Sequence, residues 1–456
     1  MRHFMATTFI CLCMQSDFAS ADATFDGLWR SDGYGLILEI SGNDVRLFST
    51  GIDVCIPEND MPAPIEDVLP GVTFRMSEDE SELLLTAPLE PHPILTRRLT
   101  SLPPGCTQVV PQTPVAVFET FVQYYDANYP FFELHDVEWS QRVSDARQRV
   151  NADMSDRALF DVLDWLIAPL RDGHVSLVAE IDGDIVVSAP GRASVLKYIR
   201  QGAEATGRNP TEAAREFRHA VWFESISQDI LDGQGHLIGN DRIQYGMVED
   251  RIGYLAFASL DGFGDEESQP AEGLQAFDSM LDEIMGFFEA SGAKGLMLDL
   301  SLNFGGSDYM ARAVASRFLH NPTVAYTKYA ADAEDPVSTR VSIEPNPTRF
   351  GGDVFLLTSQ VTVSAAEVLT IALRQGQHVH HYGETTRGAF SDALSRSLPN
   401  GWQLSMSNEV YLDASGEHWE AVGVAPEIEV TVFSDLDPIE SHRRAIQMMV
   451  QHAMEQ

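Results

Sequence analysis

The sequence has few positive charges. Its 456 residues include 30 Lys or Arg against 68 Asp or Glu, which gives a formal net charge of −38 at pH 7. Lysine is the scarcest of these types, because Lys197, Lys294 and Lys328 are the only three and the remaining cationic side chains are arginines. A surface this acidic repels the phosphates of nucleic acids and anionic lipids, so neither class is expected as a partner.

Long hydrophobic runs are also missing. An apolar run from Phe4 to Met14 is too short to span a bilayer, and no other segment reaches that length. Arg2 and His3 precede the run, and Ala19-Ser-Ala follows it as a small-x-small cleavage site. The pattern predicts a signal peptide over 1–21 and a periplasmic or secreted protein without an integral membrane segment. A buried first strand or helix is the alternative.

Cysteine is the third residue type in short supply. Two of the four cysteines, Cys11 and Cys13, would leave with the signal peptide, so Cys55 and Cys106 would remain. An even pair in an exported chain is expected to form one disulfide. Two buried thiols are the alternative.

The local sequence patterns divide the chain into successive parts with different predicted secondary structure. Short alternating strands punctuated by Gly, Asn and Pro predict a small antiparallel β domain over 22–107. Helical periodicity predicts a helical subdomain over 110–180, and a helical or extended connecting region follows over 181–250. Strands and helices alternate over 251–435, which predicts an α/β domain with a mostly parallel, covered sheet. A C-terminal helix is expected over 436–456.

Three short segments place polar residues at turns. Ser364 comes just after a buried strand, at the expected start of a helix, where the positive helix end and the amide of Ala365 would face an oxyanion. A serine there is usually only an N-cap. The strand from Asp299 runs into Gly305-Gly306, which could form either a tight turn or an amide-lined cradle. His174 follows a helix in an exposed turn, although a lone histidine is more often structural.

Together these segments resemble the tail-specific (C-terminal processing) serine peptidase superfamily, which also includes tricorn protease and the interphotoreceptor retinoid-binding protein. The resemblance covers residues 114–430 or thereabouts and leaves the β domain outside. Five markers occur in order: Asp-Gly-His at 172–174, Asp-Leu-x-x-Asn-x-Gly-Gly from Asp299, Thr-Ser-x-x-Thr-x-Ser-Ala-Ala-Glu ending at Glu367, Gly-Glu-Thr-Thr-Arg-Gly from Gly383, and Glu-Ala-Val-Gly-Val-Ala-Pro-Glu-Ile-Glu-Val from Glu420. The resemblance implies a crotonase-like ββα spiral in the catalytic domain.

The superfamily offers two mechanisms, and the lysine count separates them. In one branch a lysine that follows the serine is the base, but the matching segment here reads Thr-Arg-Gly-Ala around Arg387, and no lysine follows Lys328. Arginine does not deprotonate in proteins, so this route is excluded unless Lys197 or Lys294 folds in from elsewhere.

The tricorn-like branch uses a serine with a histidine base and a glutamate partner, and the sequence resembles this branch more closely. By this resemblance Ser364 is the nucleophile, His174 takes its proton, and Glu420 orients the imidazole. The resemblance therefore implies an exported serine peptidase that hydrolyses peptides or unfolded proteins through an acyl-enzyme. It implies no cofactor and no metal.

The resemblance also implies the residues of the oxyanion hole, and the sequence differs from the tricorn-like pattern at two positions. Gly305 or Gly306 and Ala365 would supply oxyanion-hole amides. Gly173 stands where that branch has a serine, and Ser301 stands where an arginine is usual. Gly173 is expected to orient the histidine less firmly.

Two other functions stay open. One is a non-catalytic ligand- or peptide-binding protein on the same scaffold, since fold does not guarantee activity. Residues 181–250 show no carboxylate-binding loop of a peptide-guiding PDZ domain, so no such domain and no recognition of C-terminal tails are predicted. The other is a metal hydrolase built on His378-Val-His380-His381, which lacks a supporting acidic ligand and reads better as a strand.

Overall fold

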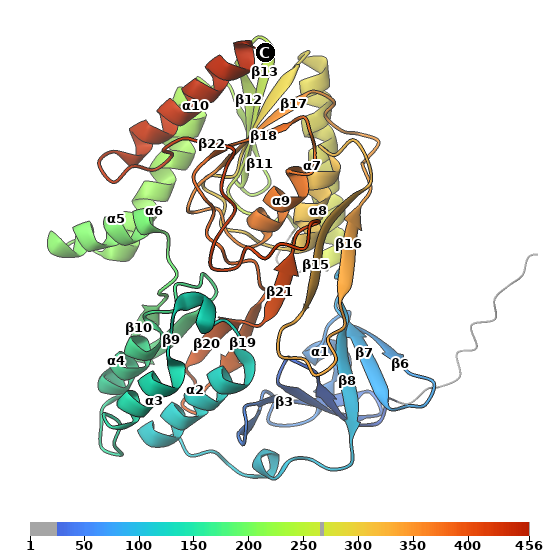
Figure 1. Cartoon of the computed structure of the whole chain (residues 1–456), viewed down its shortest axis with the longest axis vertical. Helices are drawn as coiled ribbons and strands as arrows, with labels where there is room; N and C mark the ends of the chain where they lie inside the picture. The colour runs from blue at the N-terminus through green and yellow to red at the C-terminus, as the bar shows by residue number, and fades with distance from the viewer. Residues whose placement is uncertain (1–24, 265–268, 456) are drawn as a thin grey trace, which may run out of the picture.

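The computed structural model describes residues 25–264 and 269–455, so the expected signal peptide lies outside the described residues. Within them, no helix is both long and apolar enough to cross a membrane. The molecule is elongated, with an α/β domain at one end and a helical subdomain beside a β domain at the other (Figure 1).

The first part is a sheet of eight antiparallel strands in the order β4-β3-β2-β1-β8-β7-β6, with β5 beside β3. The strands are β1 (Gly27–Ser31), β2 (Leu36–Ser41), β3 (Asp44–Thr50), β4 (Cys55–Pro57), β5 (Ala63–Pro64), β6 (Thr73–Met76), β7 (Glu82–Thr86) and β8 (Ile94–Leu99). Two short helices accompany them, α1 (Ile65–Val68) and the 3-10 helix η1 (Pro104–Thr107). A disulfide joins Cys55 to Cys106 and ties β4 to η1, with the pairing that the sequence analysis expected.

The helical subdomain packs on a four-stranded sheet. Its elements are α2 (Pro114–Asn128), the 3-10 helix η2 (Glu133–His135), α3 (Trp139–Arg147), α4 (Asp156–Ile167), β9 (Ser176–Ile181) and β10 (Asp184–Ser188). The Ser155 hydroxyl accepts the amide of Ala158 and starts α4, whose apolar face is buried. Strands β19 (Ala393–Ser397) and β20 (Gln403–Ser407) complete this sheet in the order β10-β9-β20-β19. The sequence analysis had placed both within the α/β domain.

The α/β domain contains a seven-stranded sheet in the order β11-β12-β13-β14-β17-β18-β22. Its strands are β11 (His236–Ile238), β12 (Ile243–Glu249), β13 (Ile252–Phe257), β14 (Gly295–Asp299), β17 (Asp353–Thr358), β18 (Val379–Gly383) and β22 (Ile428–Glu429). The last five pair in parallel, which confirms the mostly parallel sheet, and β11 and β12 add an antiparallel edge. The sheet thus begins before residue 251, and the ββα spiral stays a prediction.

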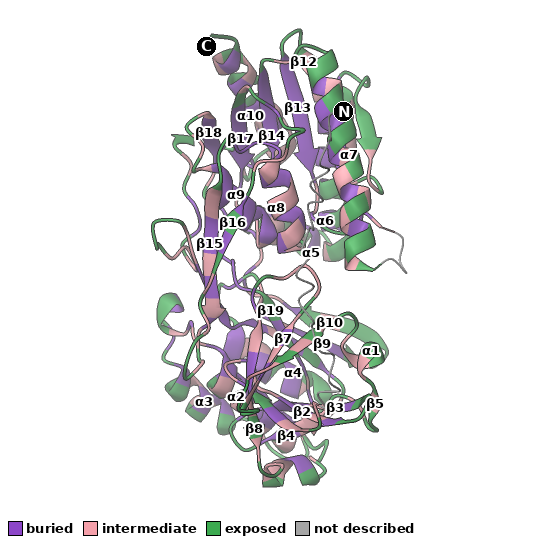
Figure 2. Cartoon of the chain, turned by 90° about the vertical axis from the view of Figure 1, so that its right-hand side faces the viewer, coloured by how far each residue is buried: buried purple, intermediate pink, exposed green. Residues whose placement is uncertain are grey.

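Helices cover both faces of this sheet, because alternate side chains of its strands point to opposite sides. Leu255, Leu298 and Leu356 enter a core with α7 (Pro270–Ala290), α8 (Asp308–Ser316) and α9 (Ala365–Leu373). Tyr254, Met297 and Phe355 enter a second core with the π-helix η3 (Ala220–Ile230) and α10 (Pro438–Glu455). The central strands are buried throughout, while α7 keeps an exposed outer face (Figure 2).

The connecting region before η3 is helical, with α5 (Ser194–Ala205) and α6 (Pro210–His219). The two helices project to one side of the molecule, above the helical subdomain in Figure 1. The Asn209 side chain accepts the amides of Thr211 and Glu212 and starts α6. These helices occupy the segment where the sequence analysis expected no PDZ domain.

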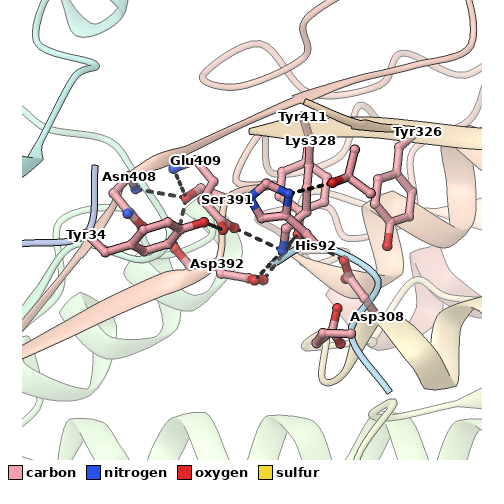
Figure 3. Close-up of polar contacts among 12 residues, drawn as sticks. Tyr34, His92, Asp308, Tyr326, Lys328, Ser391, Asp392, Asn408, Glu409 and Tyr411 are labelled. Carbon is pink, nitrogen blue, oxygen red and sulfur yellow. Dashed lines mark hydrogen bonds and ion pairs between the residues drawn. The ribbon is translucent and has the colours of Figure 1, made fainter. Parts of the chain in front are cut away.

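A three-stranded sheet, β15 (Thr323–Ala330), β16 (Thr339–Ile343) and β21 (Glu409–Leu412), runs between the α/β and β domains. Lys328 of β15 is buried there, with its ammonium 2.7 Å from Asp392 and 3.1 Å from Glu409 (Figure 3). Tyr34 of the β domain donates a 2.5 Å hydrogen bond to Glu409. Burial lowers the pKa of Lys328, but Asp392, Glu409 and Asp308 outweigh it and raise this pKa well above its ordinary value.

We predict that Lys328→Met destabilises the protein by about 3–5 kcal/mol, because it leaves buried carboxylates without their cation. Lys294→Met is the matched control, since Lys294 is exposed, and it should change stability by less than about 0.5 kcal/mol. Thermal and denaturant unfolding of both variants measure the difference. Equal stabilities of the two variants would show that the Lys328 ion pairs contribute nothing net.

Candidate active site

Ser364 lies between the end of β17 and the first residue of α9, and its side chain is half-buried. Its backbone angles are φ 61° and ψ −129°, in the positive-φ region that residues with a Cβ rarely adopt. Such a conformation persists only where the surroundings enforce it, and it is common at functional sites. The serine is therefore held in a conformation more strained than that of an ordinary N-cap.

Two acceptors hold the backbone of Ser364. Its amide donates to the carbonyl of Ala389 at 3.0 Å and to the Glu367 carboxylate at 3.1 Å. Glu367, three residues on, is fully buried in the first turn of α9. The segment around Ala389 is therefore a direct support of the serine.

Glu367 also organises that supporting segment. Its carboxylate accepts the Thr386 hydroxyl and the amide of Gly388, both at 2.6 Å, and the amide of Ala389 at 2.9 Å. Burial raises the pKa of Glu367 above its ordinary value, and these donors act in the opposite direction. Both carboxylate oxygens thus bind only donors, and one side chain fixes the serine and residues 386–389 together.

The turn at 172–174 packs against the same segment. Asp172 is buried and accepts the amide of His174 at 2.8 Å and the hydroxyls of Tyr129 and Ser407 at 3.1 Å each. A Cβ on Gly173 would lie 2.9 Å from the Cβ of Ala389. It would also lie 3.3 Å from Val363, the neighbour of Ser364. The structure therefore places His174 and Ser364 on adjoining segments, and Gly173 is the residue that allows the close approach.

The Glu420 carboxylate lies at the other end of residues 386–391. Its Oε2 accepts the amides of Phe390 at 2.8 Å and Ser391 at 3.1 Å. Burial first, and then the charge of Asp172, raise the pKa of Glu420 well above its ordinary value. Among the described residues, neither Oε1 of Glu420 nor Nδ1 of His174 has a hydrogen-bond partner, although both atoms are buried.

No hydrogen bond or ion pair between described residues joins Ser364, His174 and Glu420 to one another. Catalytic hydrogen bonds are often long in ligand-free proteins and tighten when substrate binds. The three side chains thus come from segments that pack together, but they form no hydrogen bonds or ion pairs with one another.

The glycine pair lies against the serine. A Cβ on Gly305 would lie 2.7 Å from the Cβ of Ser364, so only glycine fits there. The Gly305 amide already donates to Asn303 at 2.8 Å. The amides of Gly306 and Ala365, in contrast, donate to no acceptor in the described chain. The residues that follow Ser364 and Gly305 in the chain therefore both have unpaired amides.

Sequence reasoning missed two residues of this region. Glu367 was part of a motif but received no role, although Ser-x-x-Glu before an apolar run is the capping-box signal. Lys197 was set aside, yet α5 places it near Arg387, Arg171 and Arg192. Burial first, and then these charges, lower the pKa of Lys197.

The histidines of β18 are engaged separately. His381 is buried, its Nε2 lies 2.8 Å from the hydroxyl of Thr358, and burial lowers its pKa to about 3. His378 contacts the carbonyl of Phe318 at 2.8 Å, while His380 lies on the more exposed side of the strand. These contacts are those of a structural strand.

A further polar chain is fully buried beneath the sheet. His442 of α10 contacts Asp299 at 3.1 Å and Ser225 of η3 at 3.2 Å. All three side chains are at most 2% exposed. Although the residue types are those of a hydrolase triad, no substrate can reach them. These hydrogen-bonded side chains therefore anchor α10 to the end of β14.

Residues 251–430 match the family model "Peptidase family S41". By this match the chain is similar to the tail-specific peptidase superfamily over the α/β domain. It is 23% identical over 270 residues to the carboxy-terminal processing protease CtpA of Bacillus subtilis, covering 57% of this chain and 54% of that protein. The match thus spans about half the length of this curated relative.

Solved structures share the fold of this protein. A protein from Parabacteroides merdae described as a peptidase superposes with a TM-score of 0.58 at 24% identity, over 75% of this chain and 96% of that one. Mature CPAF in complex with lactacystin gives a TM-score of 0.54 at 14% identity, over 76% and 99% of the two chains. At these identities the likeness establishes the fold alone.

We predict that Glu367→Gln lowers stability by about 2 kcal/mol, because its NH₂ group would face donors that now meet a carboxylate oxygen. Hydrogen exchange at the amides of Gly388 and Ala389 should accelerate. The matched control is Glu427→Gln, since Glu427 is exposed. Unchanged exchange at both amides would contradict the supporting role of Glu367.

Proposed function

We propose that this protein is an exported serine peptidase of the tricorn-like kind, with Ser364 as nucleophile. One observation carries the proposal: Ser364 is held at positive φ at the start of α9 close to Gly305, and the amides of the next residues, Ala365 and Gly306, are unpaired. A tetrahedral intermediate on Ser364 would place its oxyanion near these donors, and each such donor is worth roughly 3 kcal/mol in comparable sites.

His174 is the general base in this proposal. It takes the proton of the Ser364 hydroxyl as the peptide carbonyl is attacked, and returns it to the leaving amine. Water then hydrolyses the acyl-enzyme by the same route. Glu420 orients His174 once substrate has closed the site, and the buried, unpartnered atoms Nδ1 and Oε1 support this role.

The surroundings of the lysines favour a histidine base. The carboxylates around Lys328 keep its ammonium charged, so it has no lone pair to accept a proton. Lys197 is the lysine that could compete, because its pKa is lowered and it lies near Arg387. Neither Lys197 nor His174 forms a hydrogen bond with Ser364, but the turn that carries His174 packs against Val363, the neighbour of Ser364.

We further propose a periplasmic or secreted location and a peptide or unfolded-protein substrate. The location rests on the signal-like segment at 1–21, and the substrate class rests on the family match. Processing at C-terminal tails, which the printed name of the Bacillus subtilis relative describes, is not extended to this chain.

The second candidate is a binding protein on the same scaffold. The unmade contacts between Ser364, His174 and Glu420 favour it, as does Gly173 in place of a serine. The two candidates differ in whether hydrolysis depends on Ser364.

We predict that Ser364→Ala lowers kcat by at least about 10³-fold on unfolded proteins and short peptides, because it removes the nucleophile. Ser155→Ala is the control: it removes a serine that caps α4, far from the site, and should cost about 1 kcal/mol of stability but no activity. Product release followed by mass spectrometry gives the rates. Hydrolysis that persists in Ser364→Ala, or is absent from the wild type, contradicts the proposal.

We predict that His174→Ala loses activity to a similar extent, whereas Lys197→Met keeps kcat within about threefold, since only the histidine serves as base. Steady-state kinetics of the two variants on one neutral peptide compare the two routes. The reverse result, with activity lost in Lys197→Met and kept in His174→Ala, would assign the base to the lysine.

A further inference from the structure

A cavity of about 280 Å³ opens directly beside the candidate site. Its wall includes the chain neighbours of three site residues: Gly173 next to His174, Phe304 next to Gly305, and Val363 next to Ser364. At about 30 Å³ for each water, it has room for roughly nine waters, or for one polar side chain of a peptide.

Four arginines line this cavity: Arg192, Arg200, Arg218 and Arg387. No acidic residue lines it, and none of the four forms an ion pair with a carboxylate in the described part of the chain. In the whole sequence acidic residues outnumber basic ones by 68 to 30. A cluster of unpaired cations is therefore exceptional in this protein, and it lies next to the proposed nucleophile.

Contacts other than ion pairs hold the arginine side chains of the cavity in place. Arg218 lies over the ring of Phe304 at 5.5 Å, and Arg200 makes a long hydrogen bond of 3.4 Å to the hydroxyl of Thr211. Burial lowers the pKa of Arg387 to about 10, although the charge of Glu367 acts in the opposite direction. Burial and the neighbouring charge of Arg200 both lower the pKa of Arg192. The cluster of arginines thus has an electrostatic cost that an anion would relieve.

The walls of the cavity are fixed to the active-site segments. The side chain of Gln360, in the loop before Ser364, contacts Ser194 and accepts the amide of Val195 at the start of α5. A Cβ on Gly191 would lie 1.9 Å from the carbonyl oxygen of Asp172. The loop that carries Arg192 is therefore pressed against the turn that carries His174.

We propose that this cavity is a specificity subsite that binds the side-chain carboxylate of an acidic residue of the peptide substrate. The proposal rests on the proposed peptidase function. Planar guanidinium groups bind carboxylates through paired, charge-assisted hydrogen bonds, and four of them converge here. The acidic remainder of the surface repels such a peptide, so selection for the acidic residue arises only inside this cavity.

The test compares amidated fluorogenic peptides that differ by Glu or Gln at one position, moved stepwise along the peptide. We expect one position at which Glu raises kcat/KM by about tenfold over Gln. In Arg192→Gln and Arg218→Gln the ratio of kcat/KM for the Glu peptide to that for the Gln peptide should fall towards one. Raising the ionic strength should reduce the preference in the wild type.

Arg215→Gln is the matched control. Arg215 is exposed on the same helix, α6, as Arg218 but does not line the cavity, so its removal should leave the preference intact. The cavity variants should fold at least as stably as the wild type, because each removes one of several mutually repelling charges. Equal kcat/KM for Glu and Gln at every position overturns the subsite while leaving the peptidase function standing.

Two further arms separate other outcomes. A Gln peptide with a free C-terminal carboxylate tests the chain terminus as ligand, and a preference for it over every internal Glu overturns the side-chain proposal. If no peptide is hydrolysed, the peptidase function fails instead. Fluorescence anisotropy with labelled Glu and Gln peptides then tests binding to the cavity alone. We expect the Glu peptide to bind with a Kd about tenfold lower, and Arg218→Gln to remove this difference. Equal Kd values for the two peptides would contradict the proposal.

Discussion

The Glu367 carboxylate is the contact on which the rest of the site depends. It binds the amide of Ser364 together with the Thr386 hydroxyl and two amides of the following segment. That segment supplies the carbonyl of Ala389 to Ser364 and the surface on which Gly173 packs. At its far end it donates two amides to Glu420. One stretch of six residues, 386–391, thus connects the nucleophile, the histidine turn and Glu420, the third member of the proposed triad.

Buried charge organises this protein in two different ways. Around Lys328 and in the Asp299–His442 chain, opposite charges or polar partners meet, and they join the β domain and α10 to the α/β domain. In the cavity beside Ser364, four arginines form no ion pair with a carboxylate among the described residues, and the charge of Glu367 acts only on Arg387. The first arrangement stabilises the fold, and the second leaves binding free energy available for a ligand.

Sequence patterns predicted the local elements well where periodicity was strong. The buried strand expected before Ser364 is β17, and the helix expected to start there is α9, which begins at Ala365. The lysine count excluded a lysine base after Ser364, and the choice of His174 in its place stays a prediction. Pairing across long distances could not be predicted: nothing local in β19 and β20 shows that they join β9. The arginine cavity was missed for the same reason, because its walls come from segments far apart in the sequence.

The central claim is that Ser364 is a nucleophile activated by His174. Mass spectrometry of the folded protein after treatment with a fluorophosphonate probe tests it most directly, because the probe bonds only to an activated serine. The account predicts one adduct, on the peptide that contains Ser364, and its loss in His174→Ala with the fold intact. A folded wild-type protein with no adduct, or with an adduct on another serine, would contradict it.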